Sequence, residues 1–377
     1  MPLFIISFLS STIISLLIIR YNHIHKRFGM DVIDGGPQKF HGKPVPRVGG
    51  IGIAAGLILA GLLMGLQRGV LAQEYWFLII SAIPVFAGGI GEDITKKVGV
   101  MLRLLLTFVA ATIGYFLLDI SLNRVDIPFI DFILKFPFVS LAFTMFAVGG
   151  IANAINIIDG FNGISGMVSL LIISSLGYVS YLTGDSFLMS VCFATGGAVL
   201  GFLLWNYPSG MIFLGDGGAY LLGFLIAEIS VLLVNRHPEV SAWFPMLLVV
   251  YPVTETFFSI YRKKFLRGIS PGLPDGLHFH MLIYKRLIRW LIGSKEARYI
   301  IGRNSMTAPY LWIVTMISIL PAIVFWQETI VLICLVTAFV FFYLWLYWRI
   351  VRFKSPKWLI MRKDIRDTGQ KARREKM

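Results

Sequence analysis

Three sets of acidic side chains interrupt an otherwise apolar chain. Glu92 and Asp93 lie in AGGIGEDITKK, Asp159 lies in NAINIIDGFNGISGM, and Asp216 lies in MIFLGDGGAYLLGF. Carboxylates inside or bordering membrane spans are costly and usually face a polar cavity or one another. Clustered carboxylates repel unless they share protons or a cation, and hard oxygen ligands suit Mg²⁺ or Mn²⁺. Because magnesium takes one or two carboxylates together with waters and substrate phosphates, this pattern indicates phosphate chemistry.

Polar side chains recur at every third residue in the second of these stretches, at Asn153, Asn156, Asp159 and Asn162. Asp159 and Asp216 are each followed directly by glycine. Glycine lets the backbone bend before it re-enters a helix, so that N–H groups can face an anion. Close packing of helices through small residues is the alternative interpretation of such glycines.

A second group of candidates lies in the segment LPDGLHFHMLIYKRL, which supplies Asp275, His278 and His280. An H-x-H pair could bind zinc, but two such ligands without cysteine are weak evidence. Beside a carboxylate cavity, histidines are more typical of donors to phosphate or substrate hydroxyls. Incidental histidines in an interfacial loop are the alternative.

The segment DVIDGGPQKFHGKPVPRVGG gathers Lys39, His41, Lys43 and Arg47 with three prolines. Membrane topology alone could explain its positive charge, but the prolines stiffen the segment more than a simple anchor needs. Contacts with phosphate or lipid are therefore a second interpretation of these basic side chains.

These candidates belong to a chain with the composition of a membrane protein. Of its 377 residues, 57% are hydrophobic and 14% are charged, whereas soluble domains carry roughly 25% charged residues. Cys192 and Cys334 lie far apart in apolar runs, which supports neither a disulfide framework nor a thiolate metal site. We therefore expect an all-α polytopic integral membrane protein with about 11 transmembrane helices. The predicted spans are 2–19, 49–66, 75–91, 102–118, 138–155, 163–183, 186–204, 212–233, 241–260, 308–326 and 328–348.

The basic residues predict the orientation. The first span has no basic residue before it, is followed by RYNHIHKR, and lacks an A-x-A-like cleavage site, which is typical of an uncleaved helix. With the N-terminus outside, all but four of the 34 Lys and Arg residues fall in cytoplasmic connections or in the tail, the four being Arg68, Arg124, Lys135 and Arg236. The positive-inside rule then predicts an N-out, C-in topology. It also accounts for the net charge of +14 without a nucleic-acid partner.

The predicted organisation is a single transmembrane catalytic domain, residues 1–351, followed by a basic cytoplasmic tail, residues 352–377. Its cytoplasmic active-site loops are 20–48 and 261–307. In the second loop, apolar residues at helical spacing lie opposite basic ones, which predicts an amphipathic helix at the membrane surface. These apolar residues are Leu282, Ile283, Leu287, Trp290 and Leu291.

Five motifs, in order, resemble those of the polyprenyl-phosphate N-acetylhexosamine 1-phosphate transferases, a family that starts peptidoglycan lipid, enterobacterial common antigen, O-antigen and teichoic acid synthesis. The resemblance runs from Asp31 to His280, about two thirds of the chain. GIGED with MLRLLLTF is similar to the aspartate-pair motif, NAINIIDGFNGISG to N-x-x-N-x-x-D-G-x-D-G, and FLGDGGAYLLG to F-x-G-D. KFHGKPVPRVGG resembles the first cytoplasmic motif and HFHMLIYKRL the histidine motif.

This resemblance implies a membrane enzyme of the bacterial inner membrane whose site faces the cytoplasm. It would transfer a sugar 1-phosphate, most simply N-acetylglucosamine 1-phosphate, from a UDP-N-acetylhexosamine to undecaprenyl or another polyprenyl phosphate, with release of UMP. Mg²⁺, or Mn²⁺ in its place, is the implied cofactor. The implied partners are the nucleotide sugar, the lipid phosphate and the membrane, with no nucleic acid, and a homodimer is left open.

The resemblance also implies a role for each candidate residue. Glu92 and Asp93 would lie at the acceptor phosphate, and Asp159 would be a third catalytic carboxylate. Asp216, with Asp159, would ligate Mg²⁺. The nucleotide or sugar contacts would come from Asn153, Asn156, Asn162, Asp275, His278 and His280. The phosphate or lipid contacts would come from Lys39, His41 and Arg47.

Three positions depart from the family pattern. Glu92 replaces an Asp, Asn162 replaces the second Asp of D-G-x-D-G, and Met281 stands where many members carry another His. Two other classes of protein stay open. An ion-coupled transporter would also use many spans, intramembrane acids and glycine-rich broken helices. An inactive scaffold would explain the two changed acidic positions.

Overall fold

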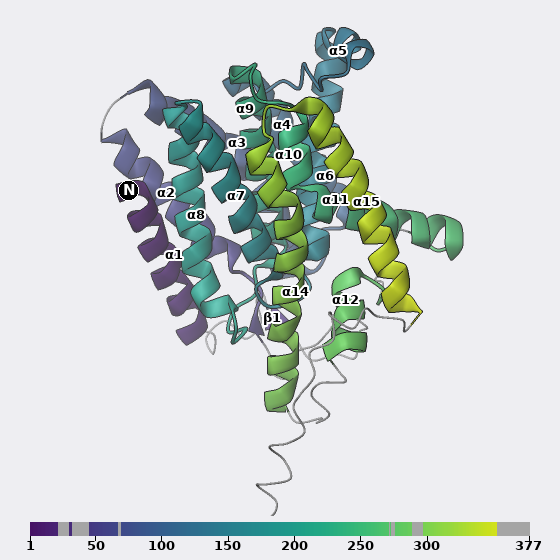
Figure 1. The fold of residues 1–377 in the computed structure, drawn as a ribbon. Coiled ribbons are helices and arrows are strands. Elements are labelled where there is room, and N and C mark those ends of the chain that lie inside the picture. The colour runs from purple at the N-terminus through teal and green to yellow at the C-terminus, as the bar shows by residue number, and fades with distance from the viewer. Residues whose placement is uncertain are drawn as a thin grey trace, which may run out of the picture.

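The computed structural model describes residues 1–21, 30–31, 45–66, 69–270, 272, 276–288 and 297–352, which form a bundle of helices (Figure 1). The first half of the chain supplies α1 (Pro2–Arg20), β1 (Met30–Asp31), β2 (Val45–Pro46), α2 (Gly50–Gly65), α3 (Val70–Thr95), α4 (Val100–Leu118), α5 (Pro128–Leu134), α6 (Pro137–Ile158) and α7 (Ile164–Leu182). The second half supplies α8 (Ser186–Asn206), α9 (Gly215–Arg236), α10 (Trp243–Leu248), α11 (Val250–Tyr261), α12 (Phe279–Ile283), α14 (Ala297–Val324), α15 (Thr329–Val351) and the π-helical segments η1 (Arg262–Leu266) and η2 (Tyr284–Ile288). The two short strands pair with each other in antiparallel fashion.

The helices confirm the predicted class, an all-α polytopic membrane protein. Within the described residues, nine helices are long and apolar enough to cross a membrane. Each of the other two predicted spans also coincides with helix, but in altered form. The helix at span 49–66, α2, has only 16 residues, and the predicted span 241–260 is divided into two short helices.

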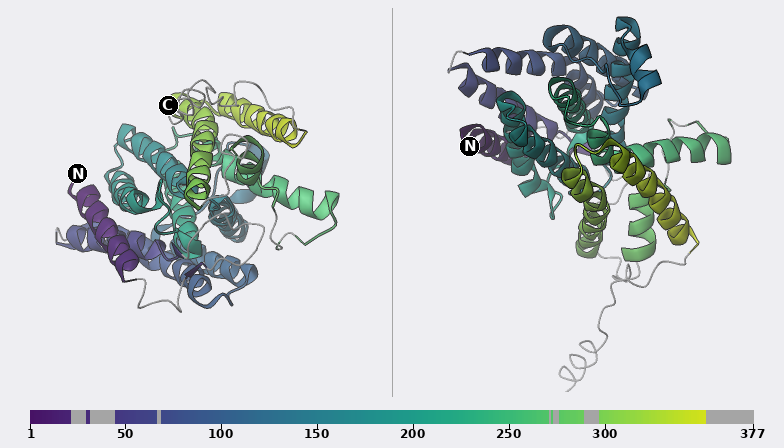
Figure 2. Two further views of the ribbon diagram at one scale, coloured as in Figure 1. Left: turned by 90° about the horizontal axis from the view of Figure 1, so that it is seen from below. Right: turned by 45° about the horizontal axis from the view of Figure 1, so that its top comes forward.

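The break in that span lies at Val249, between α10 and α11. Pro252 has no N–H, so it cannot donate to the carbonyl of Leu248 and continue the helix across this point. Beyond the break, α11 and η1 extend sideways from the bundle, as both Figure 1 and Figure 2 show. The prediction of one continuous span was therefore wrong, because hydropathy does not register a missing hydrogen-bond donor.

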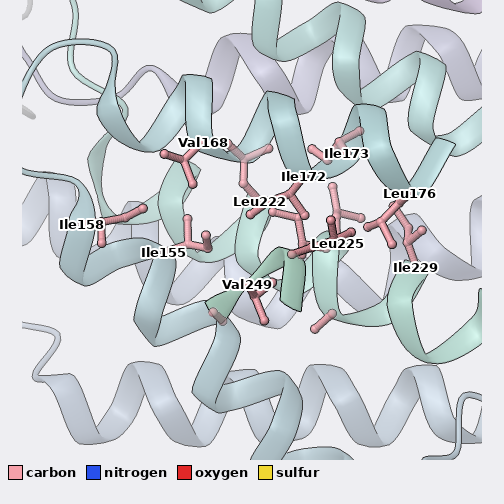
Figure 3. Close-up of a cluster of buried hydrophobic side chains, with 14 of the residues drawn as sticks. Ile155, Ile158, Val168, Ile172, Ile173, Leu176, Leu222, Leu225, Ile229 and Val249 are labelled. Carbon is pink, nitrogen blue, oxygen red and sulfur yellow. The ribbon is translucent and has the colours of Figure 1, made fainter. Parts of the chain in front are cut away.

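Helix α9 lies at the centre of the bundle, and its apolar window is entirely buried. It packs against α2, α3, α6 and α7, and its apolar side chains interdigitate with those of α6 and α7 in the cluster of Figure 3. The approach to α3 is so close that a Cβ on Gly89 would collide with the backbone of Gly217. Small residues at this crossing allow two backbones to meet, as is typical of membrane helices. The start of α9 is thereby held against α3.

The predicted amphipathic helix of the 261–307 loop forms in part, as α12 and η2. Its apolar residues Leu282, Ile283 and Leu287 are buried, and α12 packs against α14 and α15. They face protein, so the prediction that they lie on the membrane surface was wrong for this part of the loop. Trp290 and Leu291 lie outside the described residues.

The bundle has two distinct ends. Strand β1 and helix α12 lie at one end, here called the site end, and α5 lies at the other, called the far end (Figure 1). The start of α9 lies at the site end, because Phe213 donates its N–H to the carbonyl of Pro46 in β2.

Arg124 belongs to the far end, because it donates to the carbonyl of Val234 in the last turn of α9 and to that of Val240, which follows this helix. Arg236, at the last turn of α9, lies there too. Lys135, the C-cap of α5, lies there as well, so three of the four basic residues predicted outside share the far end, and Arg68 lies outside the described residues.

We expect the site end to face the cytoplasm. A C-terminal green fluorescent protein fusion should then fluoresce, whereas a C-terminal alkaline phosphatase fusion should be inactive, because the positively charged connections remain inside. The matched reporter pair joined ahead of Met1 should give the opposite result. An active C-terminal phosphatase with a dark fluorescent fusion would invert the topology.

Candidate active site

The site is built around the carboxylate of Asp216, in the first turn of α9. Its Oδ1 accepts hydrogen bonds from Arg47 Nη2 at 2.7 Å and from Asn156 Nδ2 at 2.9 Å. Its Oδ2 accepts from Nη1 of Arg103, which is buried on α4. The guanidinium of Arg103 also lies 5.4 Å from the ring centre of Tyr220. One carboxylate therefore joins α4, α6, α9 and the segment after β2.

Asp93 fixes the start of α9 against α3. Its side chain is fully buried, and its Oδ1 and Oδ2 accept the backbone N–H groups of Asp216 at 2.9 Å and Gly217 at 2.8 Å. These N–H groups belong to the first turn of a helix, which has no intrahelical acceptor for them and attracts negative charge. Gly215 turns into the helix with φ of +75°, and a Cβ there would collide with the Asp93 carboxylate. Asp93 and Asp216 are brought together by this turn.

Arg47 reaches the site because its segment pairs with the chain before α9. Phe213 donates its N–H to the carbonyl of Pro46 at 2.9 Å, and Gly49 donates to the carbonyl of Phe213 at 2.9 Å. These bonds hold Arg47, which lies between Pro46 and Gly49, beside α9. In addition to Asp216, Arg47 Nε lies 3.6 Å from Asp93 Oδ1. One third of its side chain remains exposed, so Arg47 can also reach an anion that enters from solvent.

The last turns of α6 bring three predicted residues to the same place. Asn153, Asn156 and Asp159 are spaced by three and so share one helix face. Asn156 bonds Asp216, and Asn153 Oδ1 accepts from the Tyr220 hydroxyl at 3.1 Å. Asp159 ends the helix, and its carboxylate makes no hydrogen bond with a described residue.

The charge state of Asp159 is set by its surroundings. Although part of the residue is accessible, the loss of water around the carboxyl raises its pKa to about 7. The positive charge of Arg47 opposes this rise, and the negative charges of Asp216 and Asp93 add to it. Three carboxylates and Arg47 are therefore close enough to influence one another.

The two histidines lie over the turn that follows Asp159. His280 is buried, and a Cβ on Gly160 would come within 2.7 Å of its Nε2. Burial, assisted by neighbouring His278 and opposed by Glu255, lowers the pKa of His280 to about 3. The ring is therefore neutral at ordinary pH, and its Nδ1 has no hydrogen-bond partner among the described residues. His278 stacks on it with ring centres 5.4 Å apart.

Asn162 does not join this group, and its surroundings explain why it is not Asp. Its Nδ2 donates to the carbonyl of Pro208 at 3.2 Å and to Ser305 Oγ at 3.3 Å, while its N–H donates to Asn304 Oδ1. The side chain therefore ties the turn after Asp159 to α14 and to the turn after α8. A carboxylate at this position could not donate to a carbonyl.

Replacing Asn162 by Asp should accordingly lower the free energy of unfolding by about 1–3 kcal/mol, the cost of an unsatisfied buried polar group. Thermal unfolding in detergent measures this, with Gln73→Glu on the exposed start of α3 as the control for an added carboxylate. An unchanged melting temperature together with a new preference among UDP-sugars would instead support the predicted sugar contact.

The remaining predicted residues are placed as follows. Glu92 is half-buried beside Asp93 and makes no side-chain hydrogen bond or ion pair with a described residue. Lys39, His41 and Asp275 lie outside the described residues.

Two residues that the structure connects to the site were not predicted as site residues from the sequence. Arg103 was counted as a topology charge and lay within the MLRLLLTF motif, but it was given no role in the site, although an arginine four residues into an apolar helix was itself a signal. Glu255 was included in an apolar span, yet its fully buried carboxylate binds His278 Nδ1 at 2.9 Å. Glu228 and Glu255, acids well inside the predicted spans, were themselves signals of this kind.

Asp159 and Asp216 would be the protein ligands of a magnesium ion of the kind that relies on substrate phosphates. Among the described residues, no group of three or more His, Cys, Asp or Glu side chains could hold a metal by itself. Magnesium, however, commonly uses one or two carboxylates together with water and phosphate oxygens. Asp159, whose carboxylate has no hydrogen bond, lies within electrostatic reach of Asp216. This pair would hold the ion.

The arrangement can bind and neutralise a phosphorylated ligand at the site end of the bundle. Two arginines carry positive charge beside three carboxylates, and a divalent cation would offset the negative charge that an entering phosphate dianion adds. Neutral His280 and the amides of α6 offer hydrogen bonds for a polar group. The geometry thus indicates chemistry on a phosphate, as the sequence pattern also does.

Comparison with known proteins gives a consistent family. Residues 75–234, from α3 to α9, match the family model described as glycosyl transferase family 4. A probable undecaprenyl-phosphate N-acetylglucosaminyl 1-phosphate transferase of Bacillus subtilis is 26% identical over 64% of this chain and 66% of its own length. A phospho-N-acetylmuramoyl-pentapeptide-transferase of Listeria monocytogenes is 28% identical over 64% of this chain and 76% of its own.

A third relative, an undecaprenyl-phosphate alpha-N-acetylglucosaminyl 1-phosphate transferase of Yersinia pestis, is 27% identical over 66% of this chain and 68% of its own length. The alignment thus spans slightly less than two thirds of the Bacillus relative and more of the other two. The matched region contains Asp93, Arg103, Asn156, Asp159 and Asp216. Residues 75–234 therefore match glycosyl transferase family 4, and the chain is similar to undecaprenyl-phosphate N-acetylglucosaminyl 1-phosphate and phospho-N-acetylmuramoyl-pentapeptide transferases.

Proposed function

We propose that this protein transfers an N-acetylhexosamine 1-phosphate, with N-acetylglucosamine 1-phosphate as the first choice, from a UDP-sugar to undecaprenyl or another polyprenyl phosphate. The products are a lipid-linked diphosphosugar and UMP. The reaction is the first membrane step of a cell-surface glycan, in the bacterial inner membrane with the site end facing the cytoplasm. The observation that carries this proposal is the convergence of Arg47, Arg103 and Asn156 on Asp216 beside Asp93 and Asp159.

The reaction asks for a site that tolerates a high density of negative charge. An oxygen of the lipid phosphate attacks the β-phosphorus of the UDP-sugar, and the bond from that phosphorus to the bridging oxygen breaks as UMP leaves. Arg47 and Arg103 offset the charge of the phosphates and orient them through charge-assisted hydrogen bonds. A Mg²⁺ ion held by Asp216 and Asp159 would supply further neutralisation of the diphosphate. Because the second pKa of a phosphate monoester is near 6, attack needs little help from a base.

A lipid acceptor is consistent with the shape of the neighbouring helices. Helix α11 and η1 project from the bundle (Figure 2), and Phe257, Phe265 and Leu266 on them are 59%, 70% and 53% exposed. Lys264 is exposed within the same segment. An apolar surface bordered by a basic side chain is typical of a contact with an anionic lipid at the membrane interface. A polyprenyl chain would follow this surface while its phosphate enters the site.

One observation favours the transporter interpretation as a second candidate. Glu228 is fully buried in α9, and neither carboxylate oxygen has a hydrogen-bond partner among the described residues. It lies about 18 Å along the helix from Asp216, at 1.5 Å per residue, and an intramembrane acid is often part of an ion pathway. Under the transferase proposal, Glu228→Gln leaves UMP release unchanged. Ion-coupled transport by the wild-type protein in vesicles that is lost in folded Glu228→Gln would favour the second candidate.

A panel of donors tests the proposal. Purified protein is incubated with undecaprenyl phosphate, Mg²⁺ and one of several UDP-N-acetylhexosamines, and the lipid fraction is analysed by mass spectrometry. The proposal expects a new lipid heavier than undecaprenyl phosphate by the sugar phosphate, strongest for UDP-N-acetylglucosamine. No new lipid from any donor, with a folded protein, would reject it.

A further inference from the structure

A buried carboxylate on α11 binds the segment that carries the two histidines. Glu255 is fully buried. Its Oε1 lies 2.9 Å from His278 Nδ1, and its Oε2 lies 2.5 Å from the Tyr343 hydroxyl of α15. Both oxygens also accept the backbone N–H of Phe279, at 3.3 and 3.2 Å. A buried charge is stable only when it is paired and hydrogen-bonded, and these contacts meet that condition.

The partners of Glu255 determine where the proton of His278 lies. An ionised carboxylate can only accept hydrogen bonds, and a backbone N–H can only donate. His278 Nδ1 must then be the donor in its contact with Glu255, as Tyr343 is in its own. The hydrogen bond that one ring nitrogen makes fixes the state of the other. A neutral His278 is thereby left with its lone pair on Nε2.

We propose that Glu255 is a positioning residue that keeps the proton of His278 on Nδ1, so that Nε2 is the ring nitrogen presented to the substrate. In the neutral ring, Nε2 accepts a hydrogen bond from a hydroxyl or acetamido N–H of the donor sugar. This assignment of a substrate contact rests on the proposed transferase function. The assignment of the tautomer does not, because it follows from the Glu255 contacts alone.

The same two helices hold the histidine segment at a second point. Tyr347, one helical turn after Tyr343, donates to the carbonyl of Leu277 at 3.1 Å. Arg262, at the start of η1, donates to the Tyr347 hydroxyl at 2.8 Å. The chain on either side of His278 is thus bonded to α11 and α15, which limits the positions that its ring can take. Such support is what keeps a functional side chain in one geometry.

The position of His278 connects this framework to the carboxylate site. Its ring is parallel to that of His280, with an angle of 6° between the planes, and His280 covers Gly160, next to Asp159. A rotation of the His278 ring would therefore disturb the stack beside Asp159. Glu255 acts on the site through His278 and need not touch a substrate.

Nuclear magnetic resonance of the protein labelled with ¹⁵N-histidine tests the tautomer directly. The chain has six histidines, and the loss of one signal set in His278→Asn identifies His278. We expect a proton on Nδ1 of His278 in the wild-type protein in lipid, in the absence of any substrate, and loss of this preference in Glu255→Leu. A wild-type ring that carries its only proton on Nε2 overturns the proposal, whether or not the variant folds.

Turnover tests the consequence for the site. Glu255→Gln should lower kcat/KM by about 10- to 100-fold, in the range found for residues that orient a functional ligand, and Tyr343→Phe should lower it by a smaller factor. Glu74→Gln at the far end, which alters a Glu paired with Arg236, should match the wild type. Unchanged kcat/KM in Glu255→Gln rejects the positioning role. If the wild-type protein itself has no turnover, the transferase proposal fails. The position of the ring proton, measured by nuclear magnetic resonance, still tests the tautomer assigned to His278.

Discussion

Replacing Asp216 by Asn will lower turnover by on the order of 10²- to 10³-fold, the range for removal of one group that stabilises charge at a reacting centre. The change takes away the negative charge on which Arg47 and Arg103 converge. It also removes one of the two carboxylates proposed to hold Mg²⁺. Asn has nearly the same shape as Asp, and its oxygen can still accept from an arginine, so the fold should be retained. UMP release from the purified variant measures the effect.

Glu239→Gln supplies the matched control for this loss of charge. Glu239 lies at the far end, where it is paired with His237 and 45% exposed, and its change should leave turnover at the wild-type value. The melting temperature of both variants must be recorded, since an unfolded protein would imitate a catalytic defect. Wild-type turnover in a folded Asp216→Asn protein would exclude Asp216 from the site.

The second large effect is expected at Asp93. Asp93→Asn leaves one acceptor oxygen for two helix N–H groups and turns an amide N–H₂ toward the other. An unsatisfied buried group of this kind costs about 1–3 kcal/mol of stability. Because these bonds set the position of Asp216, turnover should fall by roughly 10²-fold as well. Thermal unfolding and UMP release, measured on the same preparation, report the two effects.

The neighbouring residue offers a control for stability. Glu92→Gln makes the same change of charge one position away, where the side chain has no described partner, so its melting temperature should equal that of the wild type. A normal melting temperature in Asp93→Asn would show that the cap on α9 contributes little. Reduced turnover would then have to come from direct contact with a substrate.

Most of the fold could be predicted because the lipid environment imposes a simple pattern. A spanning helix needs a long apolar run, and each run found in the sequence coincides with a helix. The break at Val249 could not be found in this way, since hydropathy averages over about 19 residues and one missing N–H at Pro252 does not alter it. The pattern also could not tell lipid from protein as the neighbour of Leu282 and Leu287.

The site was predicted where its residues interrupt apolar runs and missed where they resemble their surroundings. Asp93, Asp159 and Asp216 stand out as acids among apolar residues, and they do lie close together. Arg103 resembled one more topology charge, and Glu255 was one polar residue in a predicted span. Asn162 was grouped with Asn153 and Asn156 by spacing and by the family motif, but the helix ends before it and the turn directs it to Pro208 and Ser305. Equal spacing places residues on one face only while the helix continues.

The most direct test of the account is UMP release by the purified protein with UDP-N-acetylglucosamine, measured with undecaprenyl phosphate and Mg²⁺ both present and with each omitted in turn. Transfer of a sugar phosphate to lipid at this site predicts UMP only when lipid and metal are both present, and a loss of on the order of 10²-fold or more in Asp216→Asn. UMP release that persists without undecaprenyl phosphate, or that is unchanged in folded Asp216→Asn, would contradict transfer of a sugar phosphate to lipid at this site.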